Sequence, residues 1–174
     1  MSKSTAKNHI FRRVGTIATC AALGAAWTVA PPPAAHADDA SLKQTILNWM
    51  PRINADSDMV NTALSGKITR GKLRRGERLI RHLDTDIATL LGAIEHDQAS
   101  SPDGVTGRQA ALETLSLTLQ GNRAIIRALR AAERGKPKLA RHDFVVADTF
   151  YREARQPGNE ADKALGLPPH TLGY

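Results

Sequence analysis

The sequence predicts an all-α protein: an up-down bundle of four to five helices, built on a long antiparallel helical hairpin, after a cleaved signal peptide. Three observations predict this class. Beyond residue 37, alanine and leucine dominate the apolar residues and only four valines occur, a mix that favours helices over strands. Apolar residues recur there at alternating three- and four-residue steps, the period of an amphipathic helix. The first 37 residues have the three-part organisation of an export signal.

The export signal begins with a basic segment, residues 1–13, and continues with an uncharged segment, residues 14–30. Three prolines follow, and Ala35-His36-Ala37 matches the small-x-small pattern at which signal peptidase cleaves. We expect cleavage after Ala37 and a bacterial protein that is secreted to the extracellular space or the cell envelope. An uncleaved membrane anchor is the alternative, although its apolar run of 17 residues is at the short limit for crossing a bilayer. The pattern leaves open whether export follows the general or the twin-arginine route.

Cleavage would leave 137 residues with 20 cations, 17 acids and no cysteine. This composition excludes a disulfide scaffold, a cysteine-ligated zinc site, a thiol nucleophile and an iron–sulfur cluster. The length favours one domain. We therefore expect a signal peptide at 1–37, a helical bundle domain at 38–157 and a partly disordered tail at 158–174, with no integral membrane span after cleavage. The oligomeric state stays open.

The first helical pattern runs from Leu42 to Ile53, and Pro51 should kink or end it near Met50. Asp56 is then a candidate N-cap of a short helix that ends at Gly66. This uncertainty at Pro51 is the reason for expecting four to five helices.

The hairpin is expected over residues 70–99 and 107–134, joined by a turn at 100–104. Thr69 and Thr106 are candidate N-caps, and Gly135 is a candidate stop signal. The apolar stripe of the first helix contains Leu73, Ile80, Leu83, Ile87, Leu90 and Ile94, with Gly76 in one slot. The stripe of the second contains Leu112, Leu115, Leu119, Asn122, Ile126 and Leu129. A short connection between two long helices predicts antiparallel packing.

A fourth stripe, formed by Phe144, Ala147, Tyr151 and Ala154, predicts one more helix. Asn122 is a polar residue in a core slot. It either specifies helix register through a buried hydrogen bond, as polar core residues do in coiled coils, or contacts a ligand.

Positive charge gathers in two segments, residues 67–81 and 123–141, each with seven cations and one acid. The hairpin would bring both segments to the end away from its turn. Cations are disfavoured at a helix N-terminus, so their accumulation there favours an anionic partner. The predicted anion-binding residues are Arg70, Lys72, Arg74, Arg75, Arg78, Arg123, Arg127, Arg130 and Arg134. Ordinary solvated helix faces are the alternative interpretation.

Catalytic and metal-binding patterns are absent from the sequence: it contains no nucleophile elbow, phosphate loop, dinucleotide fingerprint or paired-histidine metal motif. His82 and Asp86 are four residues apart and could contact one metal ion, but two ligands do not make a site. The histidines are therefore interpreted as surface residues, and the sequence predicts neither a cofactor nor an enzyme, without excluding one.

Three functions remain. The first is a secreted helical binding protein whose basic end engages an unknown anionic partner: a wall polymer, an anionic lipid, a nucleic acid or an acidic protein. Few aromatic residues are present for base stacking. The second is an oligomerising interaction protein of the cell envelope with a merely solubilising basic surface. The third is a small extracytoplasmic enzyme or cofactor carrier.

Overall fold

The computed structural model describes residues 37–173, and over this range the chain forms four α-helices and no strand. The helices are α1 (Ala37–Leu64), α2 (Arg70–His96), α3 (Pro102–Glu133) and α4 (Pro137–Ala164). The all-α class is therefore confirmed. Apart from Ala37, the expected signal peptide lies outside the described residues. None of the described helices is both long enough and apolar enough to span a bilayer.

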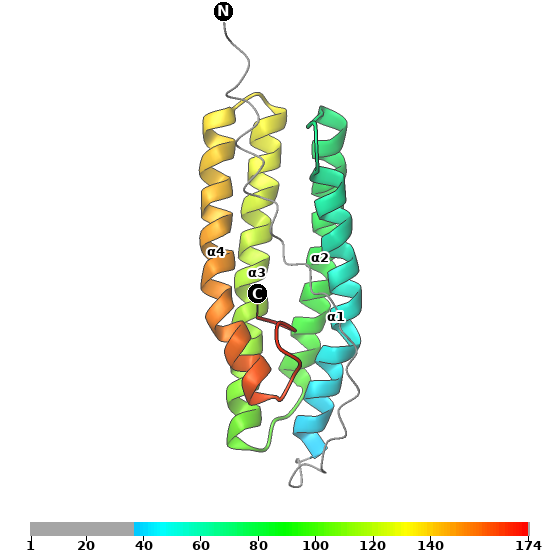
Figure 1. Cartoon of the computed structure of the whole chain (residues 1–174), viewed down its shortest axis with the longest axis vertical. Helices are drawn as coiled ribbons and strands as arrows, with labels where there is room; N and C mark the ends of the chain where they lie inside the picture. The colour runs from blue at the N-terminus through cyan, green and yellow to red at the C-terminus, as the bar shows by residue number, and fades with distance from the viewer. Residues whose placement is uncertain (1–36, 174) are drawn as a thin grey trace, which may run out of the picture.

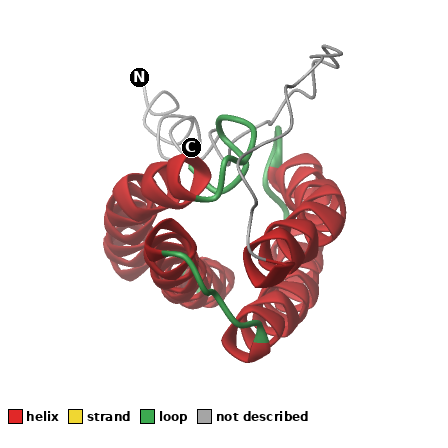
Figure 2. Ribbon diagram, turned by 90° about the horizontal axis from the view of Figure 1, so that it is seen from below, coloured by secondary structure: helices red, strands yellow, loops and turns green. Residues whose placement is uncertain are grey.

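The four helices lie side by side, and consecutive helices run in opposite directions (Figure 1). Seen along their length, they surround a common centre (Figure 2). Each helix contacts the next one along the chain, and the most extensive contact is between α3 and α4. The bundle encloses apolar side chains whose exposure is at most 2 %: Leu42, Ile46, Val60, Ile80, Ile87, Leu90, Ile94 and Leu129.

Small residues allow α3 and α4 to approach closely. Gly107 faces Leu165 and Gly121 faces the ring of Tyr151; a Cβ atom at these glycines would lie 2.5 Å and 2.7 Å from those side chains. Ala111 and Thr114 are buried between them, at the three- and four-residue steps of the same face. Close approach increases the number of van der Waals contacts between two helices.

α1 runs through Pro51 without interruption, so the expected end near Met50 is wrong. Proline removes the N–H that would pair with the carbonyl four residues earlier, but Pro51 lies on the exposed side of α1, where water can satisfy that carbonyl. Asp56 is consequently not an N-cap. It lies inside α1 and is buried against α2.

Thr69 is the N-cap of α2, as predicted, and its Oγ1 accepts a hydrogen bond from the backbone N–H of Lys72 at 3.3 Å. The predicted cap Thr106 is wrong, because α3 begins five residues before the expected start at 107. Ser101 caps α3 instead, accepting from the N–H of Gly104 at 2.9 Å. Serine followed by proline at the first helical position is a strong start signal.

Gly135 ends the α3 segment with φ +70°, as the sequence predicts. The N–H groups of Gly135 and Lys136 donate to the carbonyls of Ala132 and Ala131, the paired bonds of a Schellman motif. The short link then places the start of α4 beside the end of α3.

α4 continues through Pro157 to Ala164, so the domain boundary expected at residue 157 falls inside a helix. Residues 165–173 then pack on the bundle instead of leaving it. The carboxylate of Asp162 accepts hydrogen bonds from the N–H groups of Thr171, Leu172 and Gly173 at 2.9–3.1 Å. The side chain of Leu172 is 3 % exposed.

Candidate functional site

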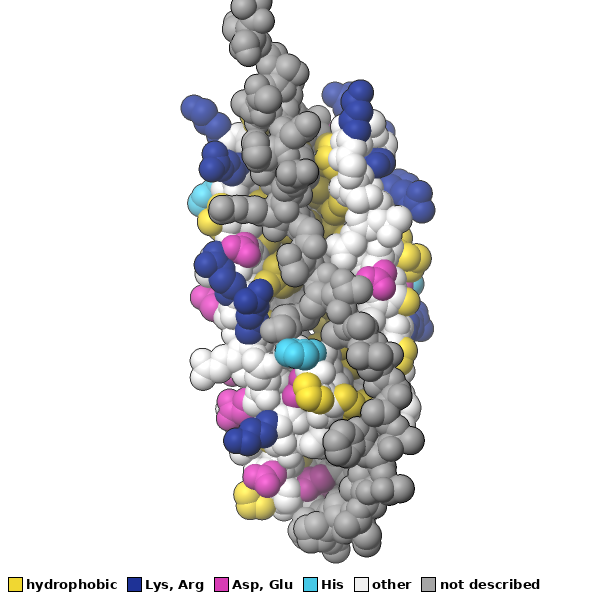
Figure 3. All heavy atoms as spheres, viewed as in Figure 1, with side chains coloured by type: hydrophobic (Ala, Val, Ile, Leu, Met, Phe, Trp, Pro, Cys, Tyr) yellow, Lys and Arg dark blue, Asp and Glu magenta, His cyan; other side chains and the backbone are white. Residues whose placement is uncertain are grey.

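The basic segments 67–81 and 123–141 are in direct contact through their side chains. The guanidinium of Arg74 donates to Glu133 at 2.6 Å, and that of Arg130 donates to Glu77 at 2.7 Å. Each ion pair joins α2 to α3. Lys and Arg side chains gather on both sides of the end where α2 begins and α3 ends (Figures 1 and 3). We call this end, residues 67–78 together with 127–141, the basic end.

Glu77 lies between the two helices and holds two cations. Its Oε1 accepts hydrogen bonds from Arg130 and also from Arg81, one turn along α2. The Arg130 hydrogen bond, reinforced by that of Arg81, holds the pKa of Glu77 below its usual range. The carboxylate therefore stays charged well below neutral pH and holds the guanidinium groups of Arg130 and Arg81 in place.

The nine predicted anion-binding residues have different environments. Arg74 and Arg130 are paired as described, and Arg127 lies 3.5 Å from Asp143 of α4. The ammonium of Lys72 donates to the carbonyl of Ser65. Four others are exposed and form no ion pair with any residue in the range 37–173: Arg70, Arg75, Arg78 and Arg134.

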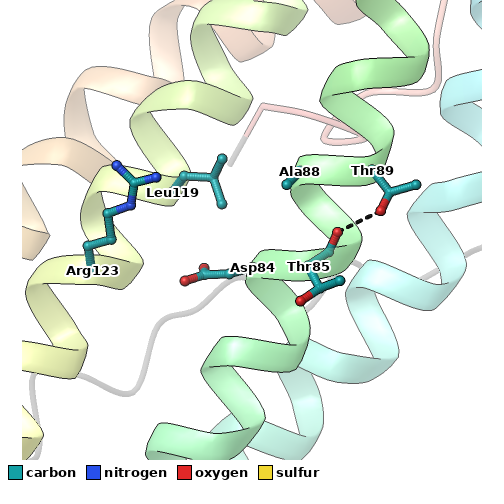
Figure 4. Close-up of a pocket in the computed structure, with 6 residues that line it drawn as sticks. All are labelled: Asp84, Thr85, Ala88, Thr89, Leu119 and Arg123. Atoms are coloured by element: carbon teal, nitrogen blue, oxygen red, sulfur yellow. Dashed lines mark hydrogen bonds between the residues drawn. The ribbon is translucent and has the colours of Figure 1, made fainter.

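Arg123, the ninth residue, lies away from the basic end and lines an open groove between α2 and α3. The groove has a volume of about 480 Å³. Its α2 wall carries Asp84, Thr85, Ala88 and Thr89, and its α3 wall carries Leu119 and Arg123 (Figure 4). Burial raises the pKa of Asp84 against the opposing effects of Asn122 and nearby arginines. The carboxyl group of Asp84 and the guanidinium of Arg123 make opposite walls polar, but the lining residues include no nucleophile paired with a general base.

Asn122 is 3 % exposed and makes hydrogen bonds on both sides. Its Nδ2 donates to Oδ1 of Asp84 at 2.8 Å, and its Oδ1 accepts from the hydroxyl of Tyr151 at 2.5 Å. The amide therefore joins three helices. Among the interpretations open from the sequence, these contacts favour the buried hydrogen bond over the ligand contact.

The histidines of α2, His82 and His96, are exposed as predicted. His82 nevertheless lies near two buried carboxylates, Asp56 and Asp86. The spacing of His82 and Asp86 in the sequence indicates that both could contact one metal ion, whereas the pattern around Asp56 is that of a helix cap. Only the packing of α1 on α2 brings the third residue close.

Comparison of the chain with protein-family models, with curated proteins and with solved structures finds no match.

Proposed function

We propose that this chain is a secreted helical binding protein whose basic end engages an anionic partner rich in phosphate or carboxylate groups. The observation that carries the proposal is the exposure of Arg70, Arg75, Arg78 and Arg134, which have no ion pair among residues 37–173. Free guanidinium groups bind phosphate and carboxylate oxygens in bidentate geometry.

The proposal treats α2 and α3 as the long antiparallel hairpin expected from the sequence. Three contacts support this register: Arg74 with Glu133, Glu77 with Arg130, and Asp84 with Asn122. Residue numbers rise along α2 as they fall along α3, which is the order of an antiparallel pair. The unpaired arginines of α2 would then share one end with Arg134.

The two bridging glutamates give this end a defined architecture. Glu77 and Glu133 neutralise the arginines between the helices, where like charges would otherwise repel. The remaining arginines face solvent, and one of them, Arg70, is the first residue of α2. Cations at a helix N-terminus oppose the helix dipole, so an anionic partner would offset an unfavourable placement.

The test compares two double variants of the full chain. Arg70→Gln/Arg78→Gln removes two exposed arginines eight residues apart on α2. Arg155→Gln/Lys163→Gln removes two exposed cations with the same spacing on α4, away from the basic end. Both variants change the net charge equally, so they separate a local site from general attraction.

The assay measures binding to inorganic polyphosphate, with anionic vesicles, single-stranded DNA and an acidic peptide as comparison probes, over a range of salt concentrations. We expect the α2 variant to bind polyphosphate about tenfold or more weakly and to show a shallower salt dependence, since fewer counterions are released. The α4 variant should bind almost as the unsubstituted chain does. Equal losses in both variants, or no binding to any anionic probe, would reject the basic end as a site and leave its charge as a solubilising surface.

A further inference from the structure

Three ionisable side chains converge at the interface of α1 and α2. Asp56 projects from α1, and His82 and Asp86 project from α2; one ligand atom of each lies within 4.8 Å of the other two. His82 and Asp86 are four residues apart, a spacing that places both on one face of the helix. The Nε2 atom of His82 is 3.8 Å from Oδ2 of Asp56.

Asp56 is the residue that points to a ligand. It is only 6 % exposed, and its Oδ2 has no hydrogen-bond donor among the described residues. A buried carboxylate without a partner is strongly unfavourable. Burial, together with the neighbouring carboxyl of Asp86, raises the pKa of Asp56, while His82 and Arg52 act in the opposite direction. Two charged carboxylates this close repel each other, and a shared proton or a bound cation would relieve that repulsion.

Arg52 supplies a positive charge to Asp86 but no hydrogen bond to Asp56. Its Nε donates to Oδ2 of Asp86 at 2.5 Å, and the guanidinium lies 5.6 Å from the centre of the Trp49 ring. The Arg52 side chain is 57 % exposed, so it can leave Asp86 at little cost in packing. It makes no hydrogen bond to Oδ2 of Asp56, which faces His82.

We propose that Asp56, His82 and Asp86 bind one divalent transition-metal ion, with zinc as the best fit. An imidazole and two carboxylates form a ligand set typical of zinc and other first-row metals, and harder ions such as magnesium prefer oxygen alone. Ligand atoms around a tetrahedral zinc ion are about 3.3 Å apart, given metal–ligand distances of about 2.0–2.1 Å. His82 is half exposed, so a small rotation of its side chain closes the remaining distance.

The metal would connect α1 to α2 and satisfy the unpaired oxygen of Asp56. Three protein ligands leave a fourth position, which water would fill from the exposed side of His82. This site is separate from the proposed basic end, since none of its ligands belongs to residues 67–78 or 127–141. The two proposals can therefore fail independently.

The test titrates ZnCl₂ alone into the untagged full chain at neutral pH in an isothermal calorimeter, and measures the melting temperature with and without zinc. We expect one zinc ion per chain and a higher melting temperature in its presence. His82→Ala and Asp56→Asn should each weaken binding about tenfold or more. The matched controls His96→Ala and Asp58→Asn replace exposed residues of the same types on the same helices, and they should leave the affinity unchanged.

Arg52→Gln should change the zinc affinity in the opposite direction. Removing the cation that competes for Asp86 should tighten zinc binding, whereas a purely structural ion pair would only lose stability. Absence of stoichiometric zinc binding would overturn the proposal, as would unchanged affinity in His82→Ala. If the chain binds no zinc and Asp56→Asn is as stable as the unsubstituted chain, the two carboxyl groups share a proton instead of a metal ion, and the proposal is wrong. Because His82 is exposed, His82→Ala should fold. The comparison of its zinc affinity with that of His96→Ala therefore tests the proposal even if Asp56→Asn does not fold.

Discussion

The hydroxyl of Tyr151 donates a hydrogen bond to Oδ1 of Asn122 at 2.5 Å, inside the contact between α4 and α3. Asn122 also donates to Asp84 of α2. Gly121, the residue before Asn122, lies against the Tyr151 ring, and its lack of a side chain leaves room for that ring. One buried amide and one glycine thus fix how three helices meet, because a shift along any helix axis would separate these partners.

Asn122→Ala should lower the free energy of unfolding by about 2 kcal/mol or more, since it leaves both the Tyr151 hydroxyl and the Asp84 carboxylate without this partner. Tyr151→Phe removes one donor and should cost about 1 kcal/mol. Urea denaturation of both single variants and of the double variant measures the coupling between the residues. If the two losses simply add, the residues act independently and the amide does not organise the helix contact.

The helices α2 and α3 could be predicted because leucine and isoleucine mark their buried faces at regular steps. Thr69 and Gly135 were predictable for a related reason, since capping depends on local backbone geometry that few residues satisfy. By contrast, the close contact between α3 and α4 depends on residues such as Gly107, Ala111 and Gly121. Glycine and alanine do not stand out in a pattern of apolar residues, so the most extensive interface left little trace in the sequence.

The predictions at Pro51 and Asp56 are wrong for one reason: local sequence rules do not contain the tertiary environment of these residues. A proline ends a helix only when the carbonyl it leaves without a partner cannot be satisfied. The same limit applies to the basic end. The sequence predicted where the cations gather, but it could not show which arginines the two glutamates occupy, because those pairs join residues more than 50 positions apart.

Gly158→Ala should destabilise the packing of residues 165–173. A Cβ atom at Gly158 would lie 2.6 Å from the backbone carbonyl oxygen of Leu172, and backbone atoms cannot move aside as a flexible side chain can. We expect a loss of about 1–3 kcal/mol, with faster hydrogen exchange in residues 165–173.

Gly92→Ala is the matched control for this glycine substitution. Gly92 lies inside α2, and apart from its chain neighbours and the adjacent backbone of the same helix, no described atom lies within 4 Å of a Cβ atom placed there. Alanine should therefore stabilise the helix by up to about 1 kcal/mol through its higher helix propensity. Equal effects of the two substitutions in thermal denaturation would contradict the proximity of Gly158 to Leu172.

Asp162→Ala should release the same C-terminal segment by a different route. The carboxylate accepts three backbone N–H groups, and hydrogen bonds to a charged acceptor contribute about 1.5–3 kcal/mol each in favourable cases. Amide exchange at Thr171, Leu172 and Gly173 should accelerate by at least about tenfold. Asp148→Ala, which removes an exposed carboxylate of α4 whose ion pair among the described residues is with Arg152, should leave exchange in that segment unchanged.

Glu77→Gln should destabilise the chain at neutral pH and lose this effect in acid. The pKa of Glu77 is lowered in the folded chain, first by the hydrogen bond from Arg130 and then by that from Arg81. A lowered folded-state pKa stabilises the protein above the pKa of the unfolded chain, and that contribution disappears as pH falls through the folded value. Denaturant melts of the variant and the unsubstituted chain should therefore differ at about pH 7 and converge as the pH falls through the folded-state pKa of Glu77. Glu113→Gln, an exposed acid of α3, provides the control over the same pH range. A difference that persists unchanged in acid would mean that the charge of Glu77 is not what holds α2 against α3.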